Sequence, residues 1–238
     1  QRVALLDKMD TIVGLFGIDL IPTGSKDPFA LRRMALGVMR ILISGNFTSV
    51  HLNKCIENAV EAYTQTGISL AEDTVSKVYD FMMDRFYYDM RTIYDHDVIT
   101  AVSKTYTPDN VILDELSKRI IMLHDFLQTD QGKNVISLYR RAQGVCDLTD
   151  DTPIAQDLLT HISEKTLYTH IMALKENVST ALGNHQYTMA LSHLQDIYAP
   201  LHDFFENVMV NVPEVDVTRN RKALLKDMLD TIKKIAIF

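Results

Sequence analysis

Residues 217–236 read VTRNRKALLKDMLDTIKKIA, and their apolar positions recur every three or four residues. This spacing is typical of an α-helix with one apolar face. That face consists of Leu225, Met228, Leu229, Ile232, Ile235 and Ala236. Because successive helical residues are rotated by about 100°, four basic residues fall within about 60° of one another beside it: Arg219, Lys222, Lys226 and Lys233. The segment predicts a helix that docks one face and exposes a basic flank.

The same spacing continues through most of the chain, and the alternation typical of strands is nearly absent. Pro and Gly are scarce and stand between the periodic segments. We therefore expect an all-α protein. The predicted helices cover approximately residues 2–15, 27–43, 50–66, 71–94, 96–104, 110–128, 131–146, 154–183, 185–198, 200–209 and 217–236.

Particular residues are expected to mark helix ends. Asp27-Pro28 is a favourable start, because Asp accepts bonds from unpaired N–H groups and Pro suits the first helical position. Asp216 or Thr218 is expected to cap the last helix, and the stretch 154–183 is expected to break near residues 160–164.

The length of 238 residues is sufficient for one large or two medium domains. A break around Pro108 favours two, residues 1–107 and 108–238. The chain does not begin with Met, which indicates a fragment of a longer protein. No apolar run reaches membrane-spanning length and no secretory signal is present, so we expect no membrane partner.

The two cysteines and the net charge bear on compartment and partners. Cys55 and Cys146 lie in separate apolar stretches without a zinc-site spacing, so we expect reduced core thiols and a cytoplasmic location. The net charge of −7 lowers the expectation of nucleic-acid binding. It does not exclude such binding, because phosphate contact is local and one basic stripe is sufficient.

Residues that could carry catalysis are few. The three His-Asp pairs, 96–97, 124–125 and 202–203, are interpreted as structural, because a metal site of that type also needs a separate His and a distal Asp. Asp7 and Asp10 share a helix face, and a solvated face is their more common role. With no phosphate-binding glycine loop and no nucleophile signature, no catalytic or metal-binding residue is predicted.

Basic residues carry the functional prediction instead. They gather before and on the second predicted helix, on the helix near residues 131–146 and on the last helix. Such stripes suit phosphate backbones, because each contact releases counterions. The alternative for any one patch is a solvated, salt-bridged face. The predicted RNA-binding residues are Lys26, Arg32, Arg33, Arg140, Arg141, Arg219, Arg221, Lys222 and Lys226.

Several stretches then resemble one known family. Residues 7–18, DKMDTIVGLFGI, and 22–41, PTGSKDPFALRRMALGVMRI, are similar to the beta subunit of two-subunit glycyl-tRNA synthetases. Shorter matches follow in the expected order: VYDFMMDRF at 78–86, FFENVMV at 204–210 and RNRKALL at 219–225. The resemblance is to the C-terminal portion of that subunit and is strongest at both ends of the chain.

The resemblance implies an HD-like helical region followed by a helical-bundle anticodon-binding domain. It implies a tRNA-binding part that supports attachment of glycine to tRNA(Gly), the chemistry residing on a separate alpha subunit in an alpha2-beta2 heterotetramer. ATP and Mg²⁺ are then expected on the alpha subunit. This chain is expected to hold no cofactor and to be non-catalytic alone. Asp7 would stand where HD domains have their last metal ligand, and no metal role is predicted for it.

Two alternatives remain open at this point. One is a remnant of an HD-type metal-dependent phosphohydrolase. The other is a helical protein-interaction scaffold, which would suit the methionine-rich helix faces at Met34, Met39, Met82 and Met83.

Overall fold

A computed structural model of the chain describes residues 2–45, 47, 49–146 and 150–238. Helices account for most of this part, and the described residues form no strand beyond one isolated bridge between Thr23 and Lys26. The predicted all-α fold is confirmed. No described helix has both the length and the apolar character needed to cross a membrane.

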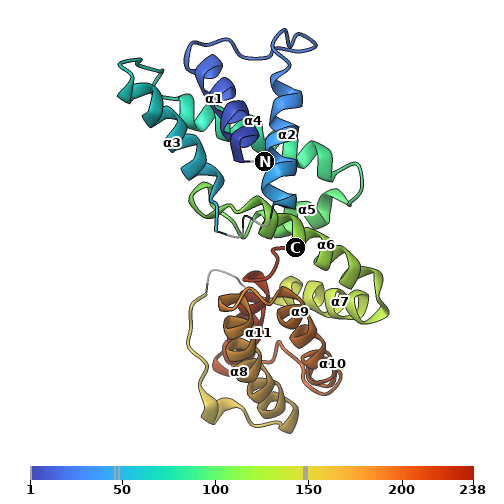
Figure 1. The fold of residues 1–238 in the computed structure, drawn as a ribbon. Coiled ribbons are helices and arrows are strands. Elements are labelled where there is room, and N and C mark those ends of the chain that lie inside the picture. Colours follow the sequence, from blue (N-terminus) through green and yellow to red (C-terminus); the bar gives the residue numbers. More distant parts are fainter. Residues whose placement is uncertain (1, 46, 48, 147–149) are drawn as a thin grey trace. The chain divides into compact units, whose positions relative to one another are not determined.

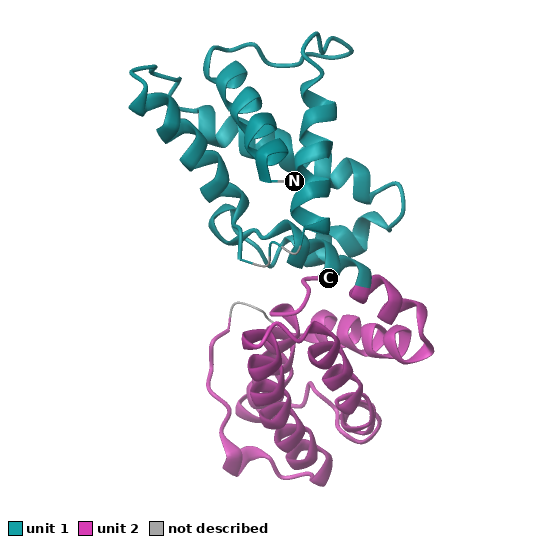
Figure 2. Cartoon of the chain, in the orientation of Figure 1, with its two compact units in different colours: residues 1–121 teal, residues 122–238 magenta. Residues whose placement is uncertain are grey.

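The chain forms two compact units, Gln1–Ile121 and Met122–Phe238, which Figure 2 colours separately. The dividing point lies within one helix, α6 (Leu113–Gln128). The domain boundary at residues 107 and 108 stays a prediction. It falls immediately ahead of a short 3₁₀ turn, η1 (Pro108–Asn110), which precedes α6.

Unit 1 is built around the helix α1 (Arg2–Gly17), which packs against three other helices (Figure 1). The side chains of Ile12, Val13 and Phe16 are fully buried there. The Phe16 ring lies against the ring of Phe81. The other helices of the unit ahead of η1 are α2 (Leu31–Ser44), α3 (Leu52–Gln65), α4 (Thr74–Met90) and α5 (His96–Ser103).

Unit 2 is built around α8 (Ile162–Gly183), which packs against α9 (Tyr187–Asp196), α10 (Tyr198–Asn207) and α11 (Val215–Lys233). The helix α7 (Asp130–Val145) also packs against these three helices. Buried apolar residues line this interior, among them Leu167, Phe204 and Leu225. A short 3₁₀ turn, η2 (Gln156–Leu158), precedes α8.

The starts of α2 and of the last helix, for which particular residues were predicted, differ from the structure. Ala30 adopts the left-handed conformation, so α2 begins at Leu31 rather than at Pro28. Asp27 still caps it, because its carboxylate accepts bonds from Leu31 N (2.8 Å) and Arg32 N (3.0 Å) across the intervening turn. The last helix begins at Val215, and the structure gives its N-cap no side-chain hydrogen bond.

Neither residue proposed as the cap of the last helix therefore serves as one. Thr218 lies within the first turn, and its hydroxyl instead bonds the backbone N and O of Val212, both at 2.9 Å. Its hydroxyl therefore fixes the loop before the helix.

The predicted break ahead of α8 is confirmed, and one buried carboxylate organises it. Glu164 is 0% exposed, and its Oε2 accepts a bond from His161 N (2.7 Å) while His161 Nδ1 accepts one from Ser163 N (3.2 Å). This is a reciprocal capping box. The other oxygen, Oε1, accepts a bond from Arg221 Nε of α11 (2.5 Å), and Arg221 also donates to Met209 O (2.9 Å). One ion pair thus joins α8, α11 and the loop between α10 and α11.

We expect Arg221→Gln to lower the free energy of unfolding by about 3–5 kcal/mol, because it leaves the Glu164 carboxylate buried without a cation. Urea denaturation followed by circular dichroism measures the change. The matched control is Arg219→Gln two residues earlier on the same helix, where the pair is half exposed and the expected loss is under about 1 kcal/mol. Equal losses for the two variants would show that the buried pair does not hold the unit together.

The corner between α6 and α7 requires a glycine. A Cβ on Gly132 would lie 2.1 Å from Phe126 O, which is backbone and cannot move aside. Gly132 N also donates to Thr129 Oγ1 (3.0 Å), the N-cap of α7. The same helix carries a second glycine, Gly144, whose Cβ would meet nothing within 4 Å.

We therefore expect Gly132→Ala to destabilise the chain by about 1–3 kcal/mol through overpacking. Gly144→Ala, the same substitution in the same helix, is expected to stabilise it by up to about 1 kcal/mol, because alanine loses less backbone entropy. Paired urea denaturation curves measure both. The packing argument fails if the two substitutions shift stability in the same direction.

Candidate nucleic-acid interface

The basic flank predicted on α11 faces a run of acidic residues from elsewhere in unit 2. Residues 150–158, here called the acidic strap, contain three aspartates and no basic residue. Arg219 Nε lies 3.5 Å from Asp150 Oδ2, and Lys226 Nζ donates a short bond to Asp151 Oδ1. Two cations of the predicted stripe are therefore paired with the strap, and a third, Lys233, pairs with Asp230 of α11 itself (2.8 Å).

The expectation that Arg219, Lys222 and Lys226 all lie on an exposed flank is wrong for Lys226. Its side chain is only 12% exposed, because its apolar stem is covered while its ammonium reaches Asp151. The hydrogen bond to Asp151 raises the pKa of Lys226 above its usual value, so the ammonium stays charged at neutral pH. Arg219 is 52% exposed, and Lys222 is partly exposed.

A polar cleft of about 390 Å³ lies between the strap, α8 and α11. Four carboxylates line it together with the ammonium groups of Lys175 and Lys226. The Lys175 ammonium binds both carboxylate oxygens of Asp227, at 2.8 and 3.0 Å. The carboxylates, which outnumber the lysines two to one, are those of Asp150, Asp151, Asp227 and Asp230. In this conformation the cleft disfavours a phosphate group.

Two cations of the predicted set have other roles within unit 2. Arg221 is the partner of buried Glu164 and only 12% exposed. The Arg141 guanidinium lies 4.3 Å above the centre of the Phe205 ring and 4.0 Å from Glu206. The Arg141 side chain is half exposed, so its outer face is open to solvent. It lines a small groove of about 290 Å³ with Phe205 and Met209.

Arg140 is the predicted cation of α7 that makes no contact with a ring or a carboxylate among the described residues. It is exposed and lines a shallow groove of about 390 Å³ that also includes Lys133, Leu127 and Ile136. Among the described residues neither Arg140 nor Lys133 makes an ion pair. The sequence analysis did not single out Lys133, although its spacing of seven residues from Arg140 puts both on one helix face.

The predicted cations of unit 1 also include one that is bonded within the protein and others that are exposed. Arg32 Nη2 donates to Gly24 O (2.7 Å), so this guanidinium holds the turn ahead of α2. The backbone of Lys26 closes that turn by bonds to Thr23, and its side chain is exposed. Arg33 and Arg40 lie exposed on α2, a helix without any acidic residue.

Lys8 of α1 was not selected from the sequence. A Cβ on Gly37 of α2 would lie 3.1 Å from Lys8 Cε, so the lysine stem crosses α2 at this glycine. Gly37 lies between Arg33 and Arg40 on the same helix face. The tertiary structure thus adds a third cation to that face.

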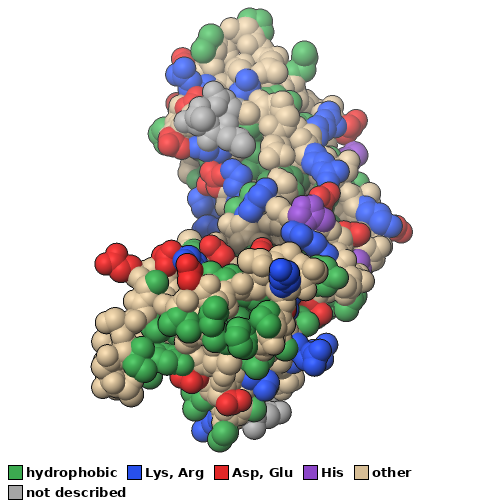
Figure 3. All heavy atoms as spheres, turned by 90° about the horizontal axis from the view of Figure 1, so that it is seen from above, with side chains coloured by type: hydrophobic (Ala, Val, Ile, Leu, Met, Phe, Trp, Pro, Cys, Tyr) green, Lys and Arg blue, Asp and Glu red, His purple; other side chains and the backbone are tan. Residues whose placement is uncertain are grey.

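On the face shown in Figure 3, Lys and Arg side chains lie in small groups among Asp and Glu, beside a hydrophobic patch. This face carries no single continuous basic surface. On this face the basic residues therefore lie in local groups among acidic residues.

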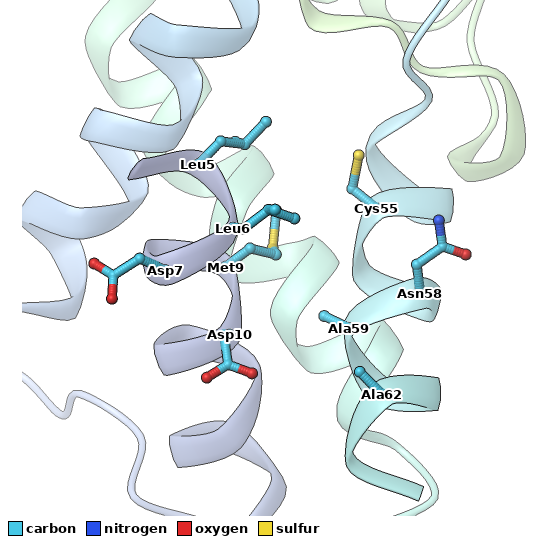
Figure 4. A pocket seen from close by; sticks show the side chains of 9 residues that line it. All are labelled: Leu5, Leu6, Asp7, Met9, Asp10, Cys55, Asn58, Ala59 and Ala62. Carbon is cyan, nitrogen blue, oxygen red and sulfur yellow. The ribbon is translucent and has the colours of Figure 1, made fainter. Parts of the chain in front are cut away.

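The pair Asp7 and Asp10 belongs to an apolar groove of about 440 Å³ between α1 and α3. Leu6 and Met9 point toward α3, whereas Asp7 points away from it (Figure 4). Tyr63 of α3 donates a hydrogen bond to Asp10 O (3.1 Å). Within the described ranges, no group of three or more His, Cys, Asp or Glu side chains is arranged to hold a metal ion.

The cysteines are both free and half-buried, rather than enclosed in the core as expected. Burial raises the pKa of Cys55, which lines the groove between α1 and α3. Burial also raises the pKa of Cys146 to about 11, and its thiol donates to Lys222 O at 3.7 Å. Both thiols are protonated at neutral pH and are therefore weak nucleophiles.

Comparison with known proteins matches both parts of the chain. Residues 1–104 match the family model of the glycyl-tRNA synthetase beta subunit, and residues 135–236 match that of the DALR anticodon binding domain. The second match begins within α7, after Lys133, and extends through α11, with the strap and the predicted basic residues of unit 2.

Individual relatives extend over nearly the whole chain. The glycine–tRNA ligase beta subunit of Rickettsia canadensis is 31% identical over 99% of this chain, and that of Neisseria gonorrhoeae is 32% identical over 98%. The aligned region makes up 34% and 33% of these relatives, so the chain spans about a third of their length. The chain therefore belongs to the glycyl-tRNA synthetase beta-subunit family and matches a C-terminal portion of its members.

Proposed function

We propose that this chain is the tRNA-binding part of a glycine–tRNA ligase beta subunit and supports attachment of glycine to tRNA(Gly) by an alpha subunit. The observation that carries the proposal is the anticodon-binding match over residues 135–236. These residues belong to one compact helical unit, so the matched sequence is also a physical module. The nine predicted RNA-binding residues enter this proposal with unequal weight.

The weight of each basic residue depends on whether its side chain is exposed and whether it already forms an ion pair. A cation that is exposed and free of an internal ion pair can neutralise a phosphate and release its counterion. Among the described residues of unit 2, Lys133 and Arg140 meet both conditions and line one groove, whereas Lys165 and Lys234, which also meet both conditions, lie elsewhere. Arg141 offers a guanidinium face already stacked on Phe205, a geometry that suits stacking on an unpaired base.

The predicted partners belong to the same proposal. An alpha subunit would carry the ATP, glycine and Mg²⁺ sites, and the assembly would be an alpha2-beta2 heterotetramer acting in the cytoplasm. The predicted division of labour follows from the family resemblance, in which this portion has no catalytic role. No residue of this chain is assigned to a cofactor.

We expect the double variant Lys133→Gln/Arg140→Gln to bind a tRNA(Gly) transcript more weakly than the parent chain at moderate salt. The slope of log affinity against log salt should become shallower by up to about one unit per lost contact. Fluorescence anisotropy titrations at several salt concentrations measure both quantities. The fold should persist, because both side chains are exposed.

The matched control is Lys165→Gln/Lys234→Gln, which removes two exposed positive charges from other parts of unit 2. A general electrostatic effect would weaken binding equally in both double variants. Binding by the parent with no difference between the two would exclude Lys133 and Arg140 as contacts. No tRNA binding by the parent would contradict the proposed function and favour the interaction-scaffold alternative.

Catalysis gives a separate test. We expect the chain alone to show no glycine-dependent exchange of pyrophosphate into ATP, and addition of the alpha subunit with the rest of the beta subunit to restore it. Exchange by the isolated chain would refute the predicted division of labour. Metal analysis of the same preparation tests the phosphohydrolase alternative, which requires a tightly bound metal ion.

A further inference from the structure

We propose that the acidic strap is an autoinhibitory contact that occupies the phosphate-binding cations of α11 and is displaced by RNA. This inference rests on the proposed tRNA-binding function. It concerns how the binding surface is regulated, and it assigns Asp150 and Asp151 the role of internal competitors for phosphate.

The first step is that the carboxylates of the strap and the phosphates of RNA bind the same kind of cation. The carboxylates of Asp150 and Asp151 face Arg219 and Lys226, which lie seven residues, or about two turns, apart on α11. A phosphate oxygen forms the same charge-assisted contacts with these groups as a carboxylate oxygen does. The strap therefore fills the positions that an RNA backbone would need along this helix.

The second step is that these contacts are weak enough to exchange. The Asp151 side chain is 91% exposed, against 12% for its partner Lys226, and Arg219 and Asp150 are both open to solvent. Ion pairs of this kind are screened by salt and contribute little to stability. In contrast, the Glu164–Arg221 pair is buried and is expected to stay in place.

The third step is that the strap has two parts. Ala155 is fixed to α11 by both amide atoms of Asn220, through bonds of 2.7 and 3.0 Å, and Asn220 is buried. Gln156 donates to the Tyr168 hydroxyl of α8 (2.7 Å). Residues 150–152 form a small turn in which Asp150 Oδ1 accepts bonds from Thr152 N and Oγ1. The proposed displacement therefore concerns residues 150–152, while residues 155–156 stay anchored.

Displacement has a thermodynamic signature. An arginine or lysine that neutralises a phosphate releases a counterion from the RNA backbone. If it gives up a carboxylate in doing so, that freed carboxylate attracts a cation from solution, and the net release of ions is smaller. If the carboxylates are neutralised by substitution, no anion is freed, and Arg219 and Lys226 contribute fully to the salt dependence. RNA should then bind more tightly and with a steeper dependence on salt.

The test compares two variants that each remove two negative charges from unit 2. Asp150→Asn/Asp151→Asn releases the two cations. Asp157→Asn/Glu176→Gln changes one residue of the strap beyond its anchors and one of α8, both exposed. Each is titrated with a tRNA(Gly) transcript over a range of salt concentrations, and urea denaturation verifies that both are folded.

We expect the Asp150/Asp151 variant to bind several-fold more tightly than the control variant, with a slope steeper by up to about 0.7–0.9 per released cation. A Lys226→Gln substitution should then weaken binding in the Asp150/Asp151 variant and leave it almost unchanged in the parent. This non-additivity is the direct signature of competition.

The proposal would be overturned if the Asp150/Asp151 variant bound tRNA no more tightly than the control variant. The strap would then have only a structural role. If the variant fails to fold, the Lys226→Gln comparison in the parent decides, because a full loss of affinity there shows that Lys226 is not occupied by the strap. Absence of tRNA binding by the parent and by every variant refutes the proposed function instead, so the two failures are distinguishable.

Discussion

The buried pair of Glu164 and Arg221 is the interaction on which the arrangement of unit 2 depends. A carboxylate with no solvent exposure requires a cation and further donors, and here it receives Arg221 from α11 and the backbone N–H of His161. It therefore fixes the start of α8, the rotation of α11 and the loop that carries Met209. Apolar burial alone would hold these helices together without specifying their register.

This constraint changes what the basic residues of α11 can do. Because Arg221 faces the interior, the helix presents Arg219 and Lys226 to the segment that leads into α8. That segment is acidic, and it neutralises the flank that α11 would otherwise expose. A net charge of −7 is thus compatible with RNA binding in a specific way: some cations are held by internal acids, and others, such as Arg140, remain accessible.

Unit 1 distributes its charges differently. Its most basic helix, α2, has no acidic residue, and the glycine in the middle of that helix lets the stem of Lys8 cross it. The groove between α1 and α3 is apolar, with the carboxylate of Asp7 turned away from α3. The two units therefore differ in the groups they expose. Unit 1 has the cationic face of α2. Unit 2 has α11, whose cations are partly neutralised, and on α7 the arginine Arg141 stacked on Phe205.

The sequence by itself determined the helical class, the order of the helices and most of their limits, because apolar spacing and Pro and Gly breaks are local signals. It also identified the break ahead of α8, where His161 and Glu164 stand three residues apart. The start of α2 was predicted three residues early, because the helical spacing gives no sign that Ala30 adopts the left-handed conformation.

Only the tertiary structure decided which basic residues are accessible. Helical periodicity placed Arg219, Lys222 and Lys226 on one flank correctly, but periodicity describes a single helix and contains no information about what packs beside it. Asp150 and Asp151 lie about seventy residues earlier in the chain, and Glu164 almost sixty. These acids reach α11 only when the chain folds. Their ion pairs determine which basic residues are bound within the protein and which are available to a partner.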